Sequence, residues 1–522
     1  MKNIELYDTT LRDGAQSEGI SFSVVDKLKI CEKLDELGVH FIEGGWPGAN
    51  PKDVDFFKKA KALKLRNAEL VAFGSTRHAG TKASRDKVLK GLLAAGTRYI
   101  TIFGKAWDLH VTDVLKTSLD ENLKMIGDSV AFLKSSGKKV FYDAEHFFDG
   151  FSSNKEYALR TLRAAADAGA DRIVLCDTNG GTITSRIFEI VKEVKAQIRA
   201  PLGIHAHNDC DMAVANSVAA VQAGCVQVHG TVNGYGERCG NANIISILAN
   251  LKLKLGMDCV SDLQLRELTE VARFVAEVCN MKIEDNEPFV GTSAFAHKAG
   301  VHVNAILKNS RTYEHVDPRT LGNHRRLLVS ELSGKSTVLK KAGEMGVDLG
   351  KDPEKSKIIL KTLQDMEHKG YHFEVAEASL ELLVKRIMKK FKDFFELEDF
   401  RVIIEKRKDG KMSSEATIKL KVGRELEHTA SLGDGPVNAL DSALRKALKK
   451  FYPKIAEMHL TDYKVRVLDE KEGTAARVRV LIQSQDTSDS WWTMGVSENI
   501  IDASWQALVD SVEYKLLKDS KA

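Results

Sequence analysis

The chain has 522 residues, of which 43% are apolar, 29% charged and 7% aromatic, a composition typical of a globular protein and not of a disordered one. Its 77 basic and 73 acidic residues leave a net charge of +4, too small a surplus to indicate a nucleic-acid or membrane partner. No apolar run approaches the roughly 18 residues of a membrane span, and the N-terminus has no signal-peptide pattern. Seven cysteines, an odd number without a C-x-x-C pair, favour a reducing cytoplasm over a disulfide framework or a zinc ribbon.

Residues 1–257 alternate short β-branched runs with helix-length segments. The expected strands are residues 4–8, 40–43, 69–73, 99–103, 140–145, 172–177, 202–207 and 226–232. Several intervening segments end in glycine, as at Gly38 and Gly96, the usual cap of a helix that returns to a sheet. Eight such units predict an α/β fold of the TIM (β/α)8 barrel type. A doubly wound open sheet is the alternative, but it usually has a glycine-rich phosphate loop where this chain has residues 8–12, DTTLR.

The second half of the chain changes pattern twice. Residues 258–395 are helical and charged, typical of linker subdomains, and from residue 398 onward strands dominate. Expected strands at 401–405, 415–421 and 428–432 precede a helix at 437–448; strands at 463–468, 477–483 and 492–496 precede a helix at 499–517. Two βββα units in a row indicate a duplicated, pseudo-symmetric domain without a catalytic cluster. We therefore expect a barrel at 1–280, linker subdomains at 281–397 and a separate C-terminal domain at 398–522, to which the family resemblance described below assigns a regulatory role.

Active sites of TIM barrels lie at the carboxyl ends of the strands, so polar residues at those positions are the candidates. They are Asp8, Arg12, Glu43, Glu145, Asp177, Thr178, His205, His207, Glu237, Arg238, Asn241 and Asn243. Because βα loops are polar in any barrel, about half of this set needs no functional explanation.

The segment His205-Ala206-His207 is the strongest local signal. Residues i and i+2 of a strand point to one face, so both imidazoles are expected to face the barrel axis. Histidines also simply pack, but Asp8 on the neighbouring strand of a closed barrel favours a divalent-metal site. Oxygen and imidazole ligands with open positions suit a catalytic Zn, Mn, Co or Mg ion.

Arg12 follows Asp8 by one turn. A guanidinium beside a metal suits a 2-oxo acid, since together they polarise a keto oxygen and hold developing negative charge. A salt bridge to Asp13 or Glu43 is the equally good structural alternative. Phe103, which ends the fourth expected strand, would narrow the pocket toward a small substrate.

Long motifs in this chain resemble the 2-isopropylmalate, homocitrate and citramalate synthase family. They are residues 11–16 (LRDGAQ) with Lys27, 202–209 (LGIHAHND), 234–242 (GYGERCGNA), 297–302 (HKAGVH), 312–314 (TYE), 433–437 (GDGPV) and 496–510. The resemblance covers essentially the whole chain. Residues 42–48 and 329–335 are most similar to the citramalate synthases, which implies condensation of acetyl-CoA with pyruvate and water to give (R)-citramalate and CoA, in the pyruvate route to isoleucine.

The resemblance also implies site roles. Asp8, His205, His207 and Asn241 would bind the metal. Arg12, Asp13, Thr178 and Phe103 would contact the substrate, and Arg12, Glu145, His302 and Tyr313 would carry the catalysis. His302 lies outside the barrel repeat, so the linker must cover a barrel mouth, and the resemblance favours that of a partner in a homodimer.

Three other functions remain open from the sequence. The nearest is 2-isopropylmalate or homocitrate synthase, with the same chemistry and another 2-oxo acid. A lyase of the same superfamily would not need the C-terminal domain, and a non-catalytic amino-acid sensor would not need Arg12, Glu145 and His302.

The C-terminal domain is expected to bind an end product. Residues 433–436, GDGP, offer backbone N–H groups at a helix start, where the carboxylate of an amino acid could dock. The citramalate resemblance favours isoleucine over leucine as a feedback effector, and a plain dimerisation module is the alternative.

Overall fold

The computed structural model describes residues 4–328, 343, 353–373, 375–391, 393–406, 408, 410–468 and 476–521. The chain divides into two compact units, residues 1–295 with 315–325, and residues 296–314 with 326–522. The motif at 329–335 lies outside the described residues. In the described part, no helix combines the length and apolar character needed to cross a bilayer.

The first unit is a closed barrel of eight parallel strands, which confirms the predicted TIM fold within residues 4–328. The strands are β1 (Glu5–Asp8), β2 (Phe41–Gly45), β3 (Glu69–Ser75), β4 (Tyr99–Lys105), β5 (Lys139–Glu145), β6 (Arg172–Asp177), β7 (Leu202–Ala206) and β8 (Gln227–Gly230). β8 pairs with β1, with Tyr7 opposite His229, and this pairing closes the sheet.

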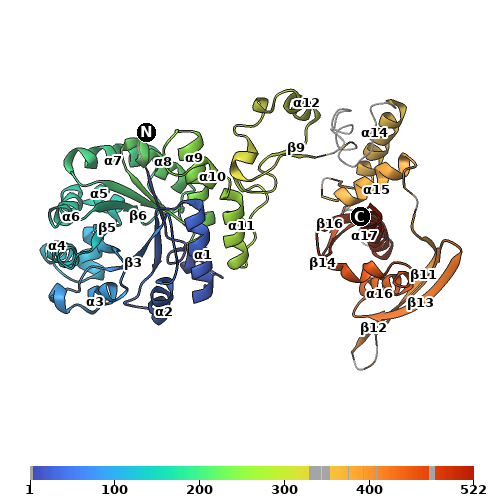
Figure 1. Cartoon of the computed structure of the whole chain (residues 1–522), viewed down its shortest axis with the longest axis horizontal. Coiled ribbons are helices and arrows are strands. Elements are labelled where there is room, and N and C mark those ends of the chain that lie inside the picture. The colour runs from blue at the N-terminus through green and yellow to red at the C-terminus, as the bar shows by residue number, and fades with distance from the viewer. Residues whose placement is uncertain are drawn as a thin grey trace. The chain divides into compact units, whose positions relative to one another are not determined.

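Helices surround the strands of the barrel (Figure 1). They are α1 (Val24–Leu37), α2 (Pro51–Ala60), α3 (Lys87–Ala94), α4 (Leu119–Ser135), α5 (Phe147–Ser153), α6 (Lys155–Asp167), α7 (Thr184–Gln197), α8 (Ala213–Ala223), α9 (Ile244–Leu253), α10 (Asp262–Leu265) and α11 (Leu268–Val278). Apolar residues at alternate strand positions, such as Leu6, Ile42 and Ile204, pack outward against these helices. The other alternate positions face the barrel interior, where Tyr7, Phe41, Val71 and Phe141 form a separate buried layer.

The second unit begins with short elements and helices. They are β9 (Ala296–His297), α12 (Gly300–Lys308), β10 (Arg326–Leu327), α14 (Pro353–His368) and α15 (Glu377–Ile387). α15 packs against the C-terminal helix α17 (Ile500–Lys521), where Arg386 contacts Asp510 at 3.1 Å.

The predicted pair of βββα units is confirmed in the described part of the second unit. One sheet contains β11 (Glu396–Lys406), β12 (Met412–Val422) and β13 (Glu425–Gly433), followed by α16 (Pro436–Leu448). The other contains β14 (His459–Val467), β15 (Val478–Gln485) and β16 (Ser490–Ser497), followed by α17. The first strand of each unit carries the same irregularity, after Leu397 in β11 and after Leu460 in β14, and this shared bulge supports a duplication.

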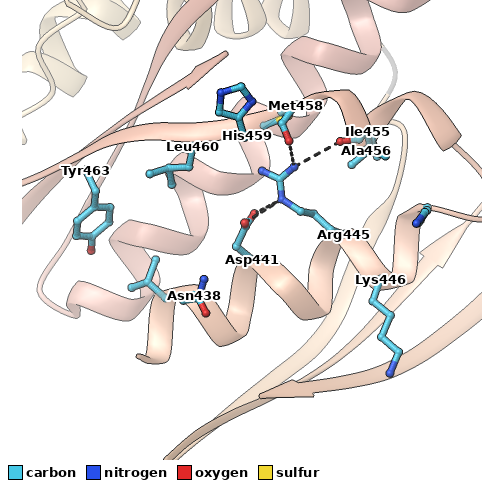
Figure 2. A pocket seen from close by; sticks show the side chains of 12 residues that line it. Asn438, Asp441, Arg445, Lys446, Ile455, Ala456, Met458, His459, Leu460 and Tyr463 are labelled. Carbon is cyan, nitrogen blue, oxygen red and sulfur yellow. Dashed lines mark hydrogen bonds and ion pairs between the residues drawn. The ribbon is translucent and has the colours of Figure 1, made fainter. Parts of the chain in front are cut away.

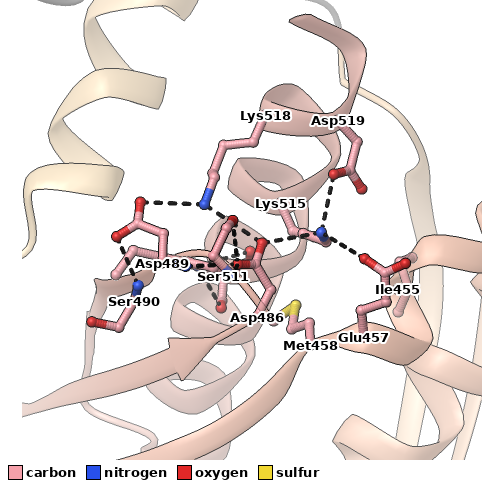
Figure 3. A network of polar contacts seen from close by, with 12 residues as sticks. Ile455, Glu457, Met458, Asp486, Asp489, Ser490, Ser511, Lys515, Lys518 and Asp519 are labelled. Carbon is pink, nitrogen blue, oxygen red and sulfur yellow. Dashed lines mark hydrogen bonds and ion pairs between the residues drawn. The ribbon is translucent and has the colours of Figure 1, made fainter. Parts of the chain in front are cut away.

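A polar network fixes the end of α17 (Figure 3). The ammonium group of Lys515 is almost fully buried and lies 3.0 Å from Asp486 and from Asp519, and 3.4 Å from Glu457. Asp486 lies just after β15, so the network ties the last helix to the sheet of its own βββα unit.

Candidate active site

A cavity of about 220 Å³ opens at the carboxyl ends of the barrel strands. Its lining comes from nearly every strand end: Arg12, Asp13, Gln16, Trp46, Phe73, Phe103, Asp143, Glu145, Cys176, Thr178, His205, His207, Glu237 and Arg238. Of the polar residues predicted at the strand ends, seven line this space and five do not: Arg12, Glu145, Thr178, His205, His207, Glu237 and Arg238 line it, whereas Asp8, Glu43, Asp177, Asn241 and Asn243 are not in its lining. Its size suits a metabolite of a few heavy atoms.

His205 and His207 meet inside this cavity. Both are 6% exposed, and their Nε2 atoms lie 3.3 Å apart. Their Nδ1 atoms have no hydrogen-bond partner among the described residues. Burial, followed by the charge of His205, lowers the pKa of His207 to about 3, which keeps that imidazole neutral, the form that binds a metal.

Asp8 does not join the two histidines, contrary to the expectation from the sequence. Tyr7 faces the barrel interior, so Asp8, one residue further along β1, faces the helix layer. Its carboxylate accepts hydrogen bonds from the backbone N (2.9 Å) and the hydroxyl (2.8 Å) of Thr10. Burial raises the pKa of Asp8 to about 7.

Asp13, and not Asp8, lies beside the two histidines. Its Oδ2 atom lies 3.3 Å from Nε2 of His205, and ligand atoms of Asp13, His205 and His207 lie within 4.8 Å of one another. Burial alone would raise the pKa of Asp13, but the charge of Arg12, together with the hydrogen bond and charge of His205 and the charge of His207, outweighs burial and holds the pKa well below its usual range. Asp13 therefore stays ionised and can bind a cation.

Asn241 completes this group. Its Nδ2 lies 2.9 Å from Oδ2 of Asp13 and 3.3 Å from Nε2 of His205, and its buried Oδ1 has no partner among the described residues. Gly236 makes room for it, because a Cβ there would lie 1.9 Å from Oδ1 of Asn241. One carboxylate, two imidazoles and a carboxamide form a donor set that fits a single divalent ion.

Arg12 is fixed beside Asp13. Its Nε donates to Oε1 of Glu43 (2.6 Å), its Nη1 lies 3.1 Å from Oδ1 of Asp13, and its guanidinium lies 3.9 Å above the ring of Phe73. Burial lowers the pKa of Arg12, but the two carboxylates outweigh burial and the pKa stands above its usual value. Arg12 makes both of the salt bridges expected as the structural alternative, and it also lines the cavity.

Glu145, Thr178 and Phe103 also line the cavity. Glu145 forms an ion pair with Lys105, and the hydroxyl of Thr178 accepts from the backbone N of His146 (2.9 Å). The ring of Phe103 stacks on Phe73, with centroids 5.5 Å apart.

His302 and Tyr313 lie in the second unit. Their rings stack there with centroids 4.0 Å apart, and Tyr313 is 46% exposed. The structure thus brings these two predicted residues together.

Sequence reasoning missed Asp143. It precedes Glu145 by two residues on β5 and therefore faces the same side, a signal that strand alternation could have revealed. Asp143 is 4% exposed and its Oδ1 has no hydrogen-bond partner among the described residues. Burial, followed by the charge of Glu43, raises the pKa of Asp143 to about 7.

Trp46 and Phe73 were missed as well, because aromatic residues at strand ends resemble ordinary core. The ring of Trp46 packs nearly perpendicular to those of Phe73 and Phe103, with centroids 6.0 and 5.6 Å apart, and the three rings form one wall of the cavity. A buried ion pair holds this wall. Nζ of Lys27 lies 2.6 Å from Oδ1 of Asp53, whose Oδ2 accepts from the backbone N of Trp46 (2.9 Å).

Comparisons with known proteins agree with this architecture. Residues 3–275 match the HMGL-like family, residues 289–370 the homocitrate synthase post-HMGL domain-like family, and residues 374–516 the LeuA allosteric (dimerisation) domain. The chain is 56% identical to the (R)-citramalate synthase of Aquifex aeolicus and 57% identical to that of Geobacter sulfurreducens, in each case over 100% of this chain and 99% of that protein. It is 31% identical to the 2-isopropylmalate synthase of Methanocaldococcus jannaschii, over 99% of this chain and 96% of that protein. The chain therefore belongs to the (R)-citramalate synthase family.

Proposed function

We propose that the barrel condenses acetyl-CoA with pyruvate and water to give (R)-citramalate and CoA, in the pyruvate route to isoleucine. The observation that carries this proposal is the convergence of Asp13, His205 and His207 beside the charged Arg12, in a cavity of about 220 Å³. That arrangement holds a small 2-oxo acid between a cation site and a guanidinium.

Asp13, His205, His207 and Asn241 are the proposed metal ligands. Their mixed oxygen and nitrogen donors suit Mn, Zn, Co or Mg. A divalent ion held there supplies Lewis-acid polarisation of the keto group.

Arg12 is proposed to donate to the keto oxygen and to stabilise the alkoxide that forms when the new C–C bond is made. Its ion pairs with Asp13 and Glu43 hold it in place before the reaction, so little reorganisation is needed. The hydroxyl of Thr178 is proposed to contact the substrate carboxylate.

Glu145 is proposed to act in the acid–base steps, with His302 and Tyr313. Removal of a proton from the acetyl methyl group gives the enolate, and a water molecule later cleaves the citramalyl thioester. Because His302 and Tyr313 lie in the second unit, we propose that they complete the site of a partner subunit. The match to a dimerisation domain supports a homodimer.

The cavity disfavours the alternative substrates. A second carboxylate, as in the substrate of a homocitrate synthase, would meet the acidic groups of Asp143, Glu145 and Glu237. The cationic side chains of the lining are already paired, Arg12 with Glu43 and Arg238 with Asp209 (2.7 Å). The aromatic wall limits room for the branched side chain used by a 2-isopropylmalate synthase.

The C-terminal domain is proposed to bind isoleucine as a feedback effector. A cavity of about 670 Å³ opens beside the start of α16, immediately after the GDGP segment. Figure 2 shows Arg445 held across it by Asp441 (2.8 Å) and by the carbonyl of Met458 (2.7 Å), while the apolar side chains of Val437 and Leu460 also line it. This mixture of charged and apolar groups suits a zwitterion with an aliphatic side chain.

A cytoplasmic location follows from the same proposal. Seven cysteines without a disulfide among them are compatible with a reducing compartment.

The test of the condensation is release of CoA thiol from acetyl-CoA across a panel of 2-oxo acids. Pyruvate should give the highest kcat/KM, well above 2-oxobutanoate, 3-methyl-2-oxobutanoate and 2-oxoglutarate, and chiral chromatography should identify (R)-citramalate. A higher kcat/KM with a branched or dicarboxylic acid would overturn the assignment.

A further inference from the structure

Tyr7 lies inside the barrel beneath the cavity and contacts Arg12 through one other residue. Its hydroxyl donates to Oε2 of Glu43 (2.6 Å), and Oε1 of the same carboxylate accepts from Nε of Arg12 (2.6 Å). Tyr7 and Glu43 are both 0% exposed. A phenol, a carboxylate and a guanidinium therefore form one continuous line from the barrel interior to the cavity.

The hydroxyl of Tyr7 has no freedom to turn elsewhere. It also lies 2.7 Å from the hydroxyl of Thr101. A phenol has a single proton, and because that proton is given to Glu43, the Tyr7 oxygen must accept from Thr101. Both hydrogen-bonding functions of the Tyr7 hydroxyl are thus engaged.

The ring of Tyr7 is fixed as well. It stacks on His229, with centroids 3.9 Å apart and planes 9° from parallel, and Phe41 and Phe141 pack around it. His229 is held in turn, since its Nε2 lies 3.1 Å from Oε1 of Gln227. The barrel core therefore sets the position of the phenol oxygen.

Glu43 links the Tyr7 hydroxyl to Arg12 and so to the cavity. Asp13, the other carboxylate on Arg12, also contacts His205 and Asn241, so it cannot serve the guanidinium alone. The Glu43 carboxylate accepts one hydrogen bond at each oxygen, from Arg12 at Oε1 and from Tyr7 at Oε2. Without the Tyr7 hydroxyl, Oε2 would be buried and unpaired, and the carboxylate could turn away from Arg12.

We propose that Tyr7 is a positioning residue that sets the direction of the Arg12 guanidinium through Glu43. Tyr7 does not line the cavity, so it has no direct contact with substrate. The proposal rests on the proposed function, because it assigns to Arg12 the stabilisation of the alkoxide. A residue of the barrel interior thereby helps to set the geometry of the reacting centre.

The direct test is Tyr7→Phe, which removes one oxygen atom and keeps the ring stack. We expect kcat to fall by about tenfold, as for loss of one hydrogen bond to a charged group, with KM for pyruvate changed by less than about twofold. Tyr142→Phe is the matched control. Tyr142 is also fully buried, but its hydroxyl donates to the carbonyl of Gly104 (3.4 Å), away from Arg12. Its kcat should stay within about twofold of the parent.

A double-mutant cycle with Arg12→Lys separates positioning from general destabilisation. If Tyr7 acts through Arg12, Tyr7→Phe should lower kcat by less than about threefold in the Arg12→Lys enzyme. The same tenfold loss in both backgrounds would overturn the proposal, and so would equal kcat values for Tyr7→Phe and Tyr142→Phe.

A second variant and a control on the unmodified enzyme complete the test. If Tyr7→Phe fails to fold, Thr101→Val tests the same hydroxyl by removing its donor, and should lower kcat about threefold with Arg12 present and not in the Arg12→Lys enzyme. Equal effects of Thr101→Val in both backgrounds would again overturn the proposal. Failure of the proposed function looks different: the unmodified enzyme would then release no CoA thiol with pyruvate.

Discussion

The barrel mouth and the C-terminal cavity are built on opposite principles. At the barrel mouth, the half-buried Arg12 is held by the buried carboxylates of Asp13 and Glu43, beside a cavity of about 220 Å³. In the C-terminal domain, the cavity measures about 670 Å³, and basic side chains such as Lys446 and Lys449 on its rim are exposed. Catalysis is faster when the catalytic groups are fixed before the substrate binds. Allosteric regulation requires only that a ligand shift an equilibrium between two conformations of the protein. The two regions should therefore respond differently to substitution.

The largest effect is expected from the metal ligands. Asp13→Ala and His207→Ala should abolish activity while the fold is kept, because both residues lie at the barrel rim and not in its packed layers. Chelation should do the same, and added Mn, Co or Mg should restore activity. Thiol release and metal content by mass spectrometry measure both outcomes.

Asp8→Asn is the matched control for Asp13. Its carboxylate faces the helix layer and bonds Thr10, so the amide should retain activity within about threefold. If Asp8→Asn lost its bound metal and Asp13→Ala retained it, Asp8 and not Asp13 would be the metal ligand, as the sequence predicts. Full activity in protein verified to be free of metal would show that the reaction does not require a metal ion.

Arg12→Lys should have the next largest effect. Lysine keeps the charge but cannot contact Glu43 and Asp13 with the same planar fork, so kcat should fall on the order of 10²-fold. The KM for pyruvate should change much less. Steady-state kinetics with unchanged kcat would show that Arg12 is only a structural ion pair.

Filling the C-terminal cavity should change regulation and not catalysis. Isoleucine should inhibit the full-length enzyme, and Ala456→Trp should abolish the inhibition while uninhibited kcat stays within about twofold. Ala456→Ser, which leaves the cavity open, should still be inhibited. Substitution is preferred to truncation near residue 395, because α15 packs on α17 through Arg386 and Asp510.

Calorimetry decides the identity of the effector. Absence of binding by either isoleucine or leucine at millimolar concentration would make the domain structural. Loss of catalysis in Ala456→Trp would show that the two regions are not separable.

The smallest effect concerns the pH dependence of stability. The pKa of Asp143 is raised to about 7, whereas an unfolded aspartate titrates near 4. Between these values the folded protein keeps a proton that the unfolded chain has lost, so the free energy of unfolding falls as pH rises through the window. The amide in Asp143→Asn cannot ionise, so the variant does not lose this part of its free energy of unfolding as the pH rises.

Relative to the parent, the melting temperature of Asp143→Asn should therefore rise by a few degrees, roughly 2–4 °C, between pH 5 and pH 8. Calorimetric scans in the presence of a chelator measure this difference. A difference that does not change with pH would show that Asp143 titrates normally.

Much of this fold could be predicted because strand spacing and helix caps repeat along the chain. The same pattern could not decide which residues of β1 face inward. A barrel strand is buried on both sides, so polarity does not distinguish its two faces. The strand pattern therefore predicts Asp8 as a metal ligand and gives no reason to choose Asp13, which follows the strand by a turn.

For a related reason, the sequence does not predict the aromatic wall of Trp46, Phe73 and Phe103. Trp46 and Phe73 carry no chemical signature, and only the pairing of the neighbouring strands β2, β3 and β4 brings them together with Phe103. The Tyr7 contact with Glu43 likewise depends on the register of β1 against β2, where Tyr7 lies opposite Phe41.

The buried pair of Lys27 and Asp53 has a consequence for how this enzyme could acquire new substrates. Because Asp53 holds the backbone of Trp46, and Lys27 also bonds the carbonyl of Gly44 (2.9 Å), the loop does not depend on the indole for its shape. Shortening the side chain at position 46 would leave empty volume that the loop cannot collapse to fill. Evolution, or an engineer, can therefore enlarge the range of accepted oxo acids by changing one side chain while the scaffold beneath it stays the same.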